Sequence, residues 1–502
     1  MSDIDNISKE LLNVYQTFSK KSKLDGLHYE IRTHSNTSTL IIYLSNPTER
    51  FYKILQDSLE ENKSQSIQAT IKKKSFENLL KTPETQLLSR TLSESLNVNR
   101  NTFENDFFSR YIRSVFGAEA KIVASGNHIV FGRRGAGKSM LLLYALNERA
   151  MNKLPNIWID MQTYSQRDDI QIITDVIIEI LEQSKMFVAS QRDVNELLKC
   201  IRDEKDISES RLRAFLPKIR RSLVQRIGIN KDTYIFLDDF HILNPQYQAK
   251  LLDIIYAFSR GNNISIKLSA IENLVTTWNS PTREGLQPGH DLQEIRLDYN
   301  LTNPEKATEH ITSILDAQAK YCALPSVNSL YNKKEVLSRL AWVSAGVPRD
   351  AISIFSQAMT KAILAKRKHV ALEDINTAAS EAINGKMEDL NSDAYSISTE
   401  LNELLDTIKT FCIKDNKLNA FLVKILPDNA NYQKIRKLID SRILHVIKES
   451  LTVRNAGEHF TALILDYGFY IGIRTAKSVD LFNRNTTKIE YPKLRKLPIF
   501  GI

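Results

Sequence analysis

The chain has 502 residues, of which 42% are hydrophobic and 25% are charged, and its net charge is +9. This balance is typical of a globular protein with about three domains, and no stretch approaches the ~18 apolar residues of a membrane span. The N-terminus shows no secretory pattern and the three cysteines are scattered, so we expect a cytoplasmic protein with reduced thiols and no membrane partner.

Four regions differ in pattern along the chain. Residues 1–100 mix helical and strand patterns, which predicts a small α+β region whose role no motif indicates. Residues 101–300 alternate short apolar strands with longer helical segments, and residues 301–390 are helical throughout. We therefore predict an α/β fold, with a doubly wound parallel-sheet core at 101–300 and an all-α lid at 301–390. The five core strands are expected at 128–131, 156–160, 234–238, 264–268 and 292–297.

A glycine-rich loop follows the first core strand. Residues 132–139 read GRRGAGKS and fit the P-loop pattern G-x-x-x-x-G-K-[ST] in full, with a strand before them and an apolar helix after them. The glycines let the backbone bring its amides close to phosphate oxygens, and the start of the helix adds its positive dipole end. Lys138 would reach the β- and γ-phosphates, and the Ser139 hydroxyl would hold Mg²⁺. The nucleotide-binding residues that we predict are Gly132, Arg133, Arg134, Gly135, Ala136, Gly137, Lys138 and Ser139.

A pair of acids ends the third core strand. Residues 234–237 are mostly apolar and are followed by Asp238 and Asp239. Because the carboxyl ends of parallel strands lie at one edge of a sheet, Asp238 would emerge beside the P-loop and help to hold Mg²⁺. Asp239 would then orient or deprotonate the attacking water. Apolar residues before two acids are common in proteins, so this interpretation depends on the complete P-loop upstream.

Four segments, taken in order, resemble the AAA+ ATPases of the origin-recognition and initiator clade. They are the P-loop, the segment at 234–239, the strand at 264–270 and the segment AGVPR at 345–349, which opens a helix. The resemblance implies that the cofactors are ATP and Mg²⁺ and that ATP is hydrolysed. It also implies that Arg349 is the lid arginine that contacts the γ-phosphate, and that Ser269 occupies the sensor position on the fourth strand.

Three features depart from the pattern of that clade. Asp239 stands where many AAA+ proteins have glutamate, which is one methylene longer, and this favours slow turnover and a switch over a motor. Ser269 stands where the sensor is often asparagine. The arginine that acts on a neighbouring subunit's ATP is not fixed by any motif; Arg283 is our candidate and Arg260 is the alternative.

The resemblance implies a winged-helix DNA-binding domain after the lid, and residues 391–502 are expected to hold one with a basic tail. Helices are expected at 401–411, 418–426 and 431–440, and strands at 442–448 and 459–465. Residues 401–502 carry 17 Lys and Arg against 10 Asp and Glu, which favours contact with double-stranded DNA. The third helix would enter the major groove, with the loop at 454–457 as the wing. The DNA-binding residues that we predict are Lys434, Arg436, Lys437 and Arg454.

These observations predict an ATP-hydrolysing AAA+ protein that acts as a nucleotide-dependent switch on DNA and forms a homo-oligomer. Its role would be that of an initiator, a loader, or an accessory ATPase of prokaryotic antiviral defence or mobile elements. The alternative is an ATP-gated signalling scaffold that oligomerises and recruits a protein effector without DNA, because winged helices also dock proteins. A third interpretation, a small-molecule P-loop kinase, fits the helical lid and the C-terminal domain poorly.

Overall fold

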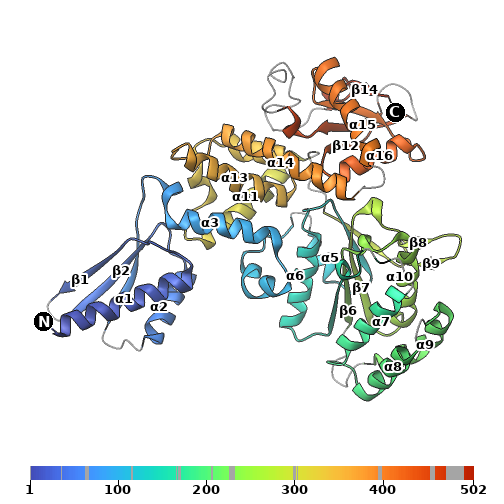
Figure 1. Cartoon of the computed structure of the whole chain (residues 1–502), viewed down its shortest axis with the longest axis horizontal. Helices are drawn as coiled ribbons and strands as arrows, with labels where there is room; N and C mark the ends of the chain where they lie inside the picture. The colour runs from blue at the N-terminus through green and yellow to red at the C-terminus, as the bar shows by residue number, and fades with distance from the viewer. Residues whose placement is uncertain are drawn as a thin grey trace. The chain divides into compact units, whose positions relative to one another are not determined.

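The computed structural model describes residues 2–501 apart from 35–36, 63–66, 115–116, 166, 168–170, 205–206, 225–231, 298–300, 302, 394–397, 453–457 and 471–490. The chain forms two compact units (Figure 1). One unit comprises Arg113–Asp298 and Ile435–Arg442, and the other comprises Met1–Ile112, Tyr299–Lys434 and Ile443–Ile502. Among the described residues, no helix combines the length and the apolar character that crossing a bilayer requires.

The first unit is built on a parallel sheet. Its strand order is β10-β4-β7-β6-β5, and every neighbouring pair runs parallel. Strands β4 and β6 are buried along their whole length, as expected for strands in a sheet that helices cover on both faces (Figure 1). The predicted α/β class is confirmed, and each predicted core strand is present. The strands are β4 (His128–Phe131), β5 (Asn156–Asp160), β6 (Thr233–Asp238), β7 (Ile264–Ala270) and β10 (Gln293–Arg296).

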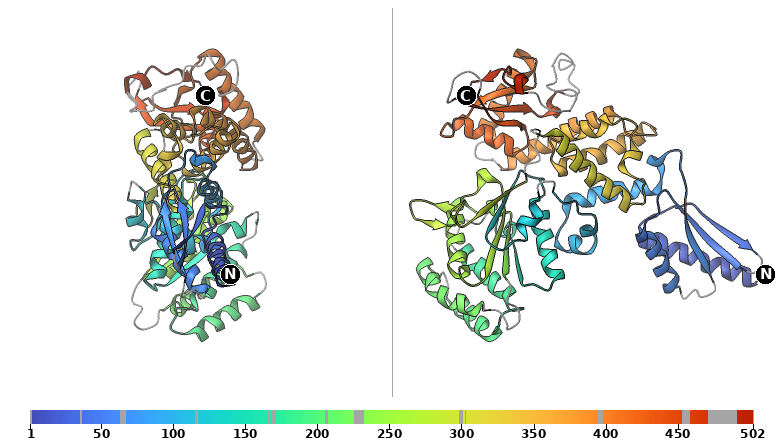
Figure 2. Two further views of the ribbon diagram at one scale, coloured as in Figure 1. Left: turned by 90° about the vertical axis from the view of Figure 1, so that its left-hand side faces the viewer. Right: turned by 180° about the vertical axis from the view of Figure 1, so that it is seen from behind.

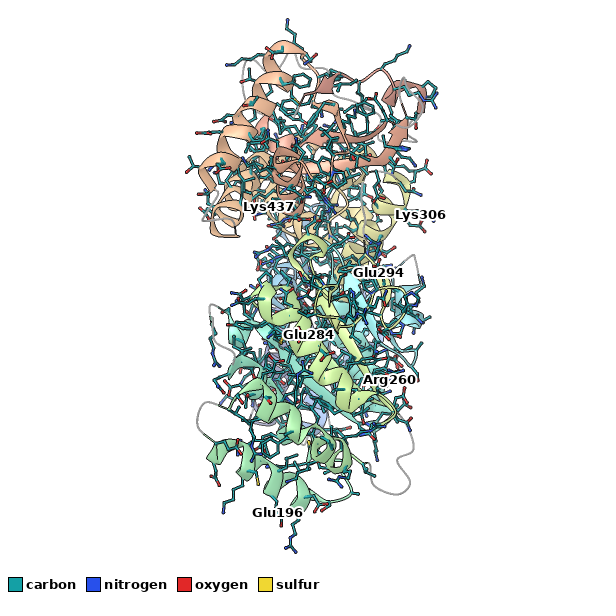
Figure 3. The ribbon with its side chains drawn as sticks, turned by 90° about the vertical axis from the view of Figure 1, so that its right-hand side faces the viewer. Glu196, Arg260, Glu284, Glu294, Lys306 and Lys437 are labelled. Carbon is teal, nitrogen blue, oxygen red and sulfur yellow. The ribbon has the colours of Figure 1, made fainter. Side chains whose placement is uncertain are left out.

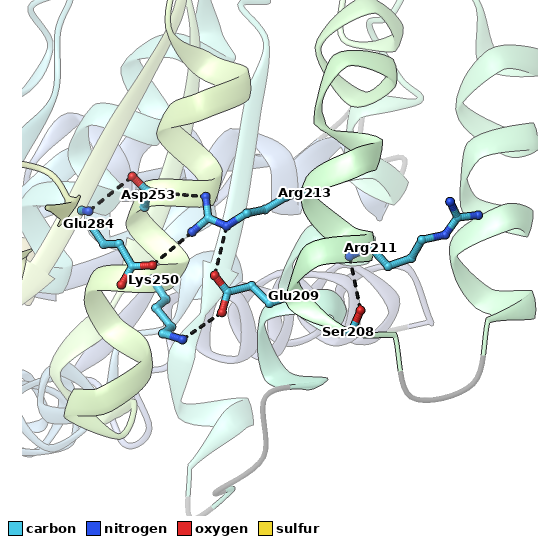
Figure 4. Close-up of polar contacts among 8 residues, drawn as sticks. Ser208, Glu209, Arg211, Arg213, Lys250, Asp253 and Glu284 are labelled. Carbon is cyan, nitrogen blue, oxygen red and sulfur yellow. Dashed lines mark hydrogen bonds and ion pairs between the residues drawn. The ribbon is translucent and has the colours of Figure 1, made fainter. Parts of the chain in front are cut away.

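A network of charged side chains joins two helices of this unit (Figure 4). The Arg213 guanidinium of α9 lies 2.7 Å from Asp253 of α10 and 3.0 Å from Glu209 of its own helix. Lys250 of α10 lies 2.8 Å from the same Glu209, so each charge has an opposite neighbour. A network holds two helices better than an isolated exposed pair does. The helices of the unit are α5 (Ala118–Ile122), α6 (Lys138–Met151), α7 (Gln171–Ser184), α8 (Gln191–Asp203), α9 (Glu209–Ser222) and α10 (Pro245–Ser259).

The N-terminal region is a small sheet with two helices. Strand β2 pairs antiparallel with β1 and parallel with β3, which gives the order β1-β2-β3. Helix α1 packs on β2 and on α2, and α2 packs on β3, so both helices cover the same face of the sheet (Figures 1 and 2). The elements are α1 (Ser2–Ser22), β1 (Tyr29–His34), β2 (Thr37–Leu44), α2 (Glu49–Glu61) and β3 (Gln68–Lys73).

The predicted all-α lid follows the core in the sequence. Asn303 caps its first helix by accepting a hydrogen bond from the Lys306 amide at 3.3 Å. Helix α3 (Pro83–Glu94) packs against two of the lid helices, α11 and α13, so the N-terminal segment contributes to this layer. The lid helices are α11 (Pro304–Tyr321), α12 (Glu335–Val343), α13 (Pro348–Leu364) and α14 (Leu372–Asp393).

The C-terminal region differs from the expected three helices and two strands. The helix predicted at 418–426 is wrong, because β11 (Ala420–Lys424) occupies that position and pairs with β13 and β14. A short apolar run fits a buried strand and a helix equally well, and the pairing with the neighbouring strands decides the outcome. The end of the chain is not a free basic tail, since β14 joins a sheet of order β12-β13-β11-β14. The other elements are α15 (Ser398–Thr410), α16 (Ala430–Asp440), β12 (Leu444–Thr452), β13 (His459–Leu465), α17 (Tyr491–Leu494) and β14 (Ile499–Phe500).

A buried ion cluster joins the lid to the C-terminal sheet inside the second unit. Lys386 of α14 lies 2.6 Å from Asp466, which follows β13, and 3.4 Å from Asp350 of α13. His445 of β12 contacts the same Asp466 oxygen at 2.8 Å. Burial alone would raise the pKa of Asp466, but Lys386 and His445 outweigh burial and hold that pKa well below its ordinary range. The cluster therefore contributes stability only while Asp466 is ionised.

We expect Asp466→Asn to lower the free energy of unfolding by about 3 kcal/mol, because Lys386 would stay buried with too little opposing charge. The lowered pKa means that this stabilisation is complete above the unfolded-state pKa of about 4 and is lost as the pH falls through lower values. Urea unfolding followed by circular dichroism should show a difference between wild type and variant that shrinks below about pH 4.

Asp428→Asn is the matched control, because Asp428 is an exposed carboxylate of the same C-terminal region. It should leave the unfolding transition unchanged. An Asp466→Asn variant as stable as wild type at neutral pH would contradict the structural role of the cluster.

Candidate functional site

The predicted core site gathers at the carboxyl ends of the parallel strands. Gly132 directly follows β4, Asp238 ends β6, and Ser269 is the last but one residue of β7. The register places Val130 of β4 opposite Ser269, so the P-loop begins beside that serine. The carboxyl edge of a parallel sheet is where such folds bind ligands. The strand order thus brings together three segments of the chain, the first and last of which, at Gly132 and Ser269, are far apart in the sequence.

The backbone of the P-loop has the conformation that its glycines allow. Gly135 and Gly137 have φ angles of 75° and 95°, a left-handed region that other residues rarely adopt. Gly137 is also the N-cap of α6, so the loop leads directly into the amino end of a 14-residue helix. A Cβ atom at position 132 would lie 3.1 Å from the Ala136 Cβ, which is tighter than ordinary packing. A glycine-rich loop of this kind can present a cradle of backbone amides to an anion.

Lys138 lies in this cradle with little access to solvent. Its side chain is 6% exposed, and the Nζ donates a hydrogen bond to the Arg133 carbonyl oxygen at 3.3 Å. Burial lowers the pKa of Lys138, while the charges of Asp239 and Asp238 oppose that change. A buried ammonium group is costly unless anions surround it. Phosphate oxygens in the cradle would supply that missing negative charge.

Ser269 connects the two acids of the site. Its hydroxyl donates a hydrogen bond to Asp238 Oδ1 at 2.5 Å, and it accepts one from the Asp239 amide at 2.8 Å. Asp239 has a left-handed φ of 53°, a conformation that costs a residue with a Cβ atom some strain. The hydrogen bond from its amide holds Asp239 in this conformation. Ser269 thus positions both acids, whichever role each acid has.

The two acids repel each other in a buried position. Burial raises the pKa of Asp238 to about 6, and the charge of Asp239 adds to the increase, whereas hydrogen bonds from Ser269 and Ser139 oppose it. Burial also raises the pKa of Asp239, while the charge of Lys138 opposes the increase. A cation between these oxygens would stabilise both carboxylates in their ionised form.

The oxygen donors fit a small hard cation that is shared with a nucleotide. Ser139 is close enough to the Asp238 carboxylate to lower its pKa, so both groups can face one ion. Mg²⁺ prefers oxygen ligands and is commonly held by one or two protein groups, substrate phosphates and water. Within the described part of the chain, no group of three or more His, Cys, Asp or Glu residues could hold a metal alone. The donor set therefore suits a metal bound together with phosphates.

Two residues of the site were not singled out in the sequence. Asp160 ends β5 opposite Asp238 in register, and its charge contributes to the raised pKa values of both acids. The signal for it was a second apolar strand that ends in an acid. His241 follows the acids by two residues, and its Nδ1 is buried without a hydrogen-bond partner among the described residues. Burial and the charges of Lys138 and Arg134 lower its pKa to about 3, so the ring is neutral.

The predicted arginines lie in different parts of the fold. Arg349 is the second residue of α13 in the lid, and its contact with a γ-phosphate remains a prediction. Arg283 is exposed between β8 (Trp278–Asn279) and β9 (Glu284–Gly285), with a φ of 56°, and it has no ion pair with any residue that the structure describes. Arg260 is the C-cap of α10, at the amino end of β7, which is the edge of the sheet away from the P-loop (Figure 3). The contact of either arginine with the ATP of another subunit remains a prediction.

The predicted DNA-binding cations lie on α16, except for one. Lys434 contacts Glu400 of α15 at 2.5 Å, so its charge is partly balanced within the chain. Arg436 and Lys437 are partly exposed on the same helix (Lys437 is labelled in Figure 3). Arg454, on the predicted wing, lies outside the described residues. Their contact with DNA remains a prediction.

A family model described as ORC-CDC6-like matches residues 150–339, a range that contains both acids and Ser269 but begins after the P-loop. None of the curated proteins compared with the chain matches it significantly. Among solved structures, Drosophila ORC bound to DNA is 15% identical, with 85% of this chain and 98% of that chain covered and a TM-score of 0.37.

Two archaeal structures are similarly distant. Cdc6p from Pyrobaculum aerophilum is 16% identical, with 81% of this chain and 96% of that chain covered and a TM-score of 0.35. A Walker-type ATPase of Pyrococcus abyssi is 14% identical, with 78% and 94% covered and a TM-score of 0.40. Likenesses at this distance assign no role to any residue. The family model supports the resemblance to the initiator clade, and over residues 150–339 the chain is similar to the ORC-CDC6-like family.

Proposed function

We propose that the chain is an ATP-dependent switch that assembles on double-stranded DNA as a homo-oligomer. The observation that carries the nucleotide part is the arrangement of a buried Lys138 behind a glycine cradle and next to two acids joined by Ser269. ATP would be the nucleotide, as in the AAA+ proteins that the chain resembles, and Mg²⁺ would be the metal. The core thus offers candidates for the phosphate-binding cation, the metal ligands and the acid that positions water.

Each residue of the core has a distinct role in this proposal. Lys138 and the loop amides would hold the β- and γ-phosphates, while Ser139 and Asp238 would hold Mg²⁺. Asp239 would orient the attacking water and accept its proton. Because the side chain of aspartate is one methylene shorter than that of glutamate, the carboxylate is set back from the phosphate and turnover is slow. Slow turnover suits a switch, in which the ATP-bound state must persist.

The lid would sense the nucleotide through Arg349. A cation in the first turn of α13 is disfavoured by the dipole of its own helix. Contact with the γ-phosphate would relieve that cost, so the arginine would favour ATP over ADP. Arg283, exposed and unpaired among the described residues, would reach the ATP of a neighbouring copy.

DNA is the partner that the charge of the C-terminal region supports best. Residues 401–502 carry 17 cations against 10 acids. Helix α16 with Lys434, Arg436 and Lys437, followed by the β12–β13 hairpin, would be the DNA-binding element of a winged-helix-like domain. The proposed switch is compatible with an initiator-like, a loader-like or a defence-associated role, and the residues of the chain do not distinguish between these roles.

One observation favours the second candidate, an ATP-gated scaffold that recruits a protein effector. In residues 398–452, strand β11 stands between α15 and α16 where a further helix was expected, so the described elements lack the helix pair of a helix-turn-helix. Lys434 is also partly balanced by Glu400. A domain of this kind would dock a protein rather than read a DNA groove.

We expect wild type to hydrolyse ATP slowly, and Lys138→Ala and Asp239→Asn each to lose about 100-fold or more of that rate. Lys138→Ala removes the phosphate-binding cation, and Asp239→Asn removes the proton acceptor. Steady-state phosphate release measures the rates. Asp203→Asn, an exposed acid of α8, is the matched control and should hydrolyse ATP at the wild-type rate. An unchanged rate in Lys138→Ala would rule out the P-loop as the site of the activity.

We expect duplex DNA to change the rate of ATP hydrolysis, and ATP to tighten duplex binding with a steep salt dependence. Lys437→Glu should weaken duplex binding and reduce its salt slope, whereas Lys414→Glu, an exposed lysine outside the helix, should not. Fluorescence anisotropy with a labelled duplex at several salt concentrations measures the affinity for the duplex and its salt dependence. If duplex DNA has no effect while ATP still drives oligomerisation, the scaffold function replaces the DNA switch.

A further inference from the structure

The N-terminal sheet has one face covered by helices and one face open. On the covered face, Leu40, Ile42 and Leu44 of β2 are fully buried beneath α1 and α2. The Tyr29 ring of β1 lies on the same side, with its centroid 4.3 Å from that of Tyr15 of α1. Both helices lie on this side in the views of Figure 2. The alternate residues of each strand therefore point away from the helices.

The register identifies the side chains of the open face. Thr39 is opposite Arg32 and Gln68, and its hydroxyl lies 3.4 Å from the Gln68 Oε1, which confirms that these side chains share one side. The same alternation places Tyr43 beside Lys72. Apart from the buried Ile41, polar, aromatic and basic side chains cover this face instead of a second apolar layer. The residues of the open face are Glu30, Arg32, Thr39, Ile41, Tyr43, Gln68, Thr70 and Lys72.

Three aromatic rings lie at one end of this face, with Lys74 between two of them. The Tyr43 ring lies 5.1 Å from the His28 ring in an edge-on contact. The Lys74 Nζ lies 5.2 Å from the centre of the Tyr43 ring and 5.9 Å from that of Phe76. His28 is exposed, and Tyr43 and Phe76 are partly exposed, so solvent reaches this row of rings.

The charge of the open face is positive. Its acid is Glu30, which Arg32 balances at 2.9 Å. Lys72 is exposed and has no hydrogen bond or ion pair with any residue that the structure describes. Lys72 and Lys74 are therefore available to anions, next to ring faces and edges.

We infer that this open face binds single-stranded nucleic acid. Unpaired bases stack on aromatic side chains, while neighbouring lysines contact the phosphates, and a flat sheet surface presents both together. Duplex DNA would not use the rings, because its bases are already stacked and paired. An acidic peptide would use the lysines but would leave the aromatic row without a role. The site is separate from the ATPase core and does not depend on the function proposed for it.

The test measures the anisotropy of fluorescein-labelled oligo(dT) and oligo(U) of about 20 nucleotides with the full-length chain in the absence of ATP. We expect binding, about tenfold weaker binding in Tyr43→Leu, and wild-type binding in Tyr43→Phe, which keeps a ring. Lys72→Glu should weaken binding and lower the slope of log affinity against log salt by about 0.7 or more. Tighter binding of one oligonucleotide assigns the site to DNA or to RNA.

Lys73→Glu is the matched control, because Lys73 is also exposed but the strand alternation directs it to the other side of the sheet. It changes the net charge as much as Lys72→Glu does and should leave binding unchanged. Equal losses in the two lysine variants would overturn the inference, because they would show attraction by net charge alone. Oligonucleotide binding that neither Lys72→Glu nor Tyr43→Leu alters would also overturn it, as would no binding by wild type.

Discussion

The core is organised around buried charged side chains at one edge of its sheet, which the protein alone balances only in part. Lys138 is nearly buried, and Asp238 and Asp239 are close to it and to each other. Both acids have raised pKa values and the lysine has a lowered one, so the protein alone leaves these charges poorly solvated. A polyphosphate with a divalent cation would supply the opposite charge that each group lacks. The site is thus prepared for a ligand that carries both signs of charge.

The rest of the fold explains how this arrangement is maintained. The order of the parallel strands places the P-loop beside β7, whose Ser269 fixes both acids. In the other unit, Asp350 follows Arg349 directly and contacts Lys386, which in turn contacts Asp466 behind the C-terminal sheet. A movement of α13 would therefore disturb a buried ion cluster that the C-terminal region shares.

Much of the core could be predicted because its signals are local. The P-loop needs glycine at fixed spacing, and buried parallel strands appear as short apolar runs, so each predicted core strand is present, while the roles of the site residues stay predictions. Asp160 was missed, since only the strand order shows that it lies opposite Asp238. His241 was missed because no local pattern shows its burial near the charges of Lys138 and Arg134. A helix was predicted over the strand at 420–424 because its four buried residues fit a buried helix and a buried strand equally well. Pairing with the strands at 459–465 and 499–500 decides its conformation. The open face of the N-terminal sheet likewise depends on register, which no local pattern gives.

The central claim is that Asp238 and Ser139 hold a metal together with a bound nucleotide. Calorimetric titration of ATP into wild type and Asp238→Asn, with excess Mg²⁺ and with EDTA, tests it most directly. The account predicts that Mg²⁺ tightens ATP binding by about tenfold or more in wild type, and that the variant loses this gain while it keeps the weaker binding seen in EDTA. An equal effect of Mg²⁺ on both proteins, or no ATP binding by wild type, would contradict it.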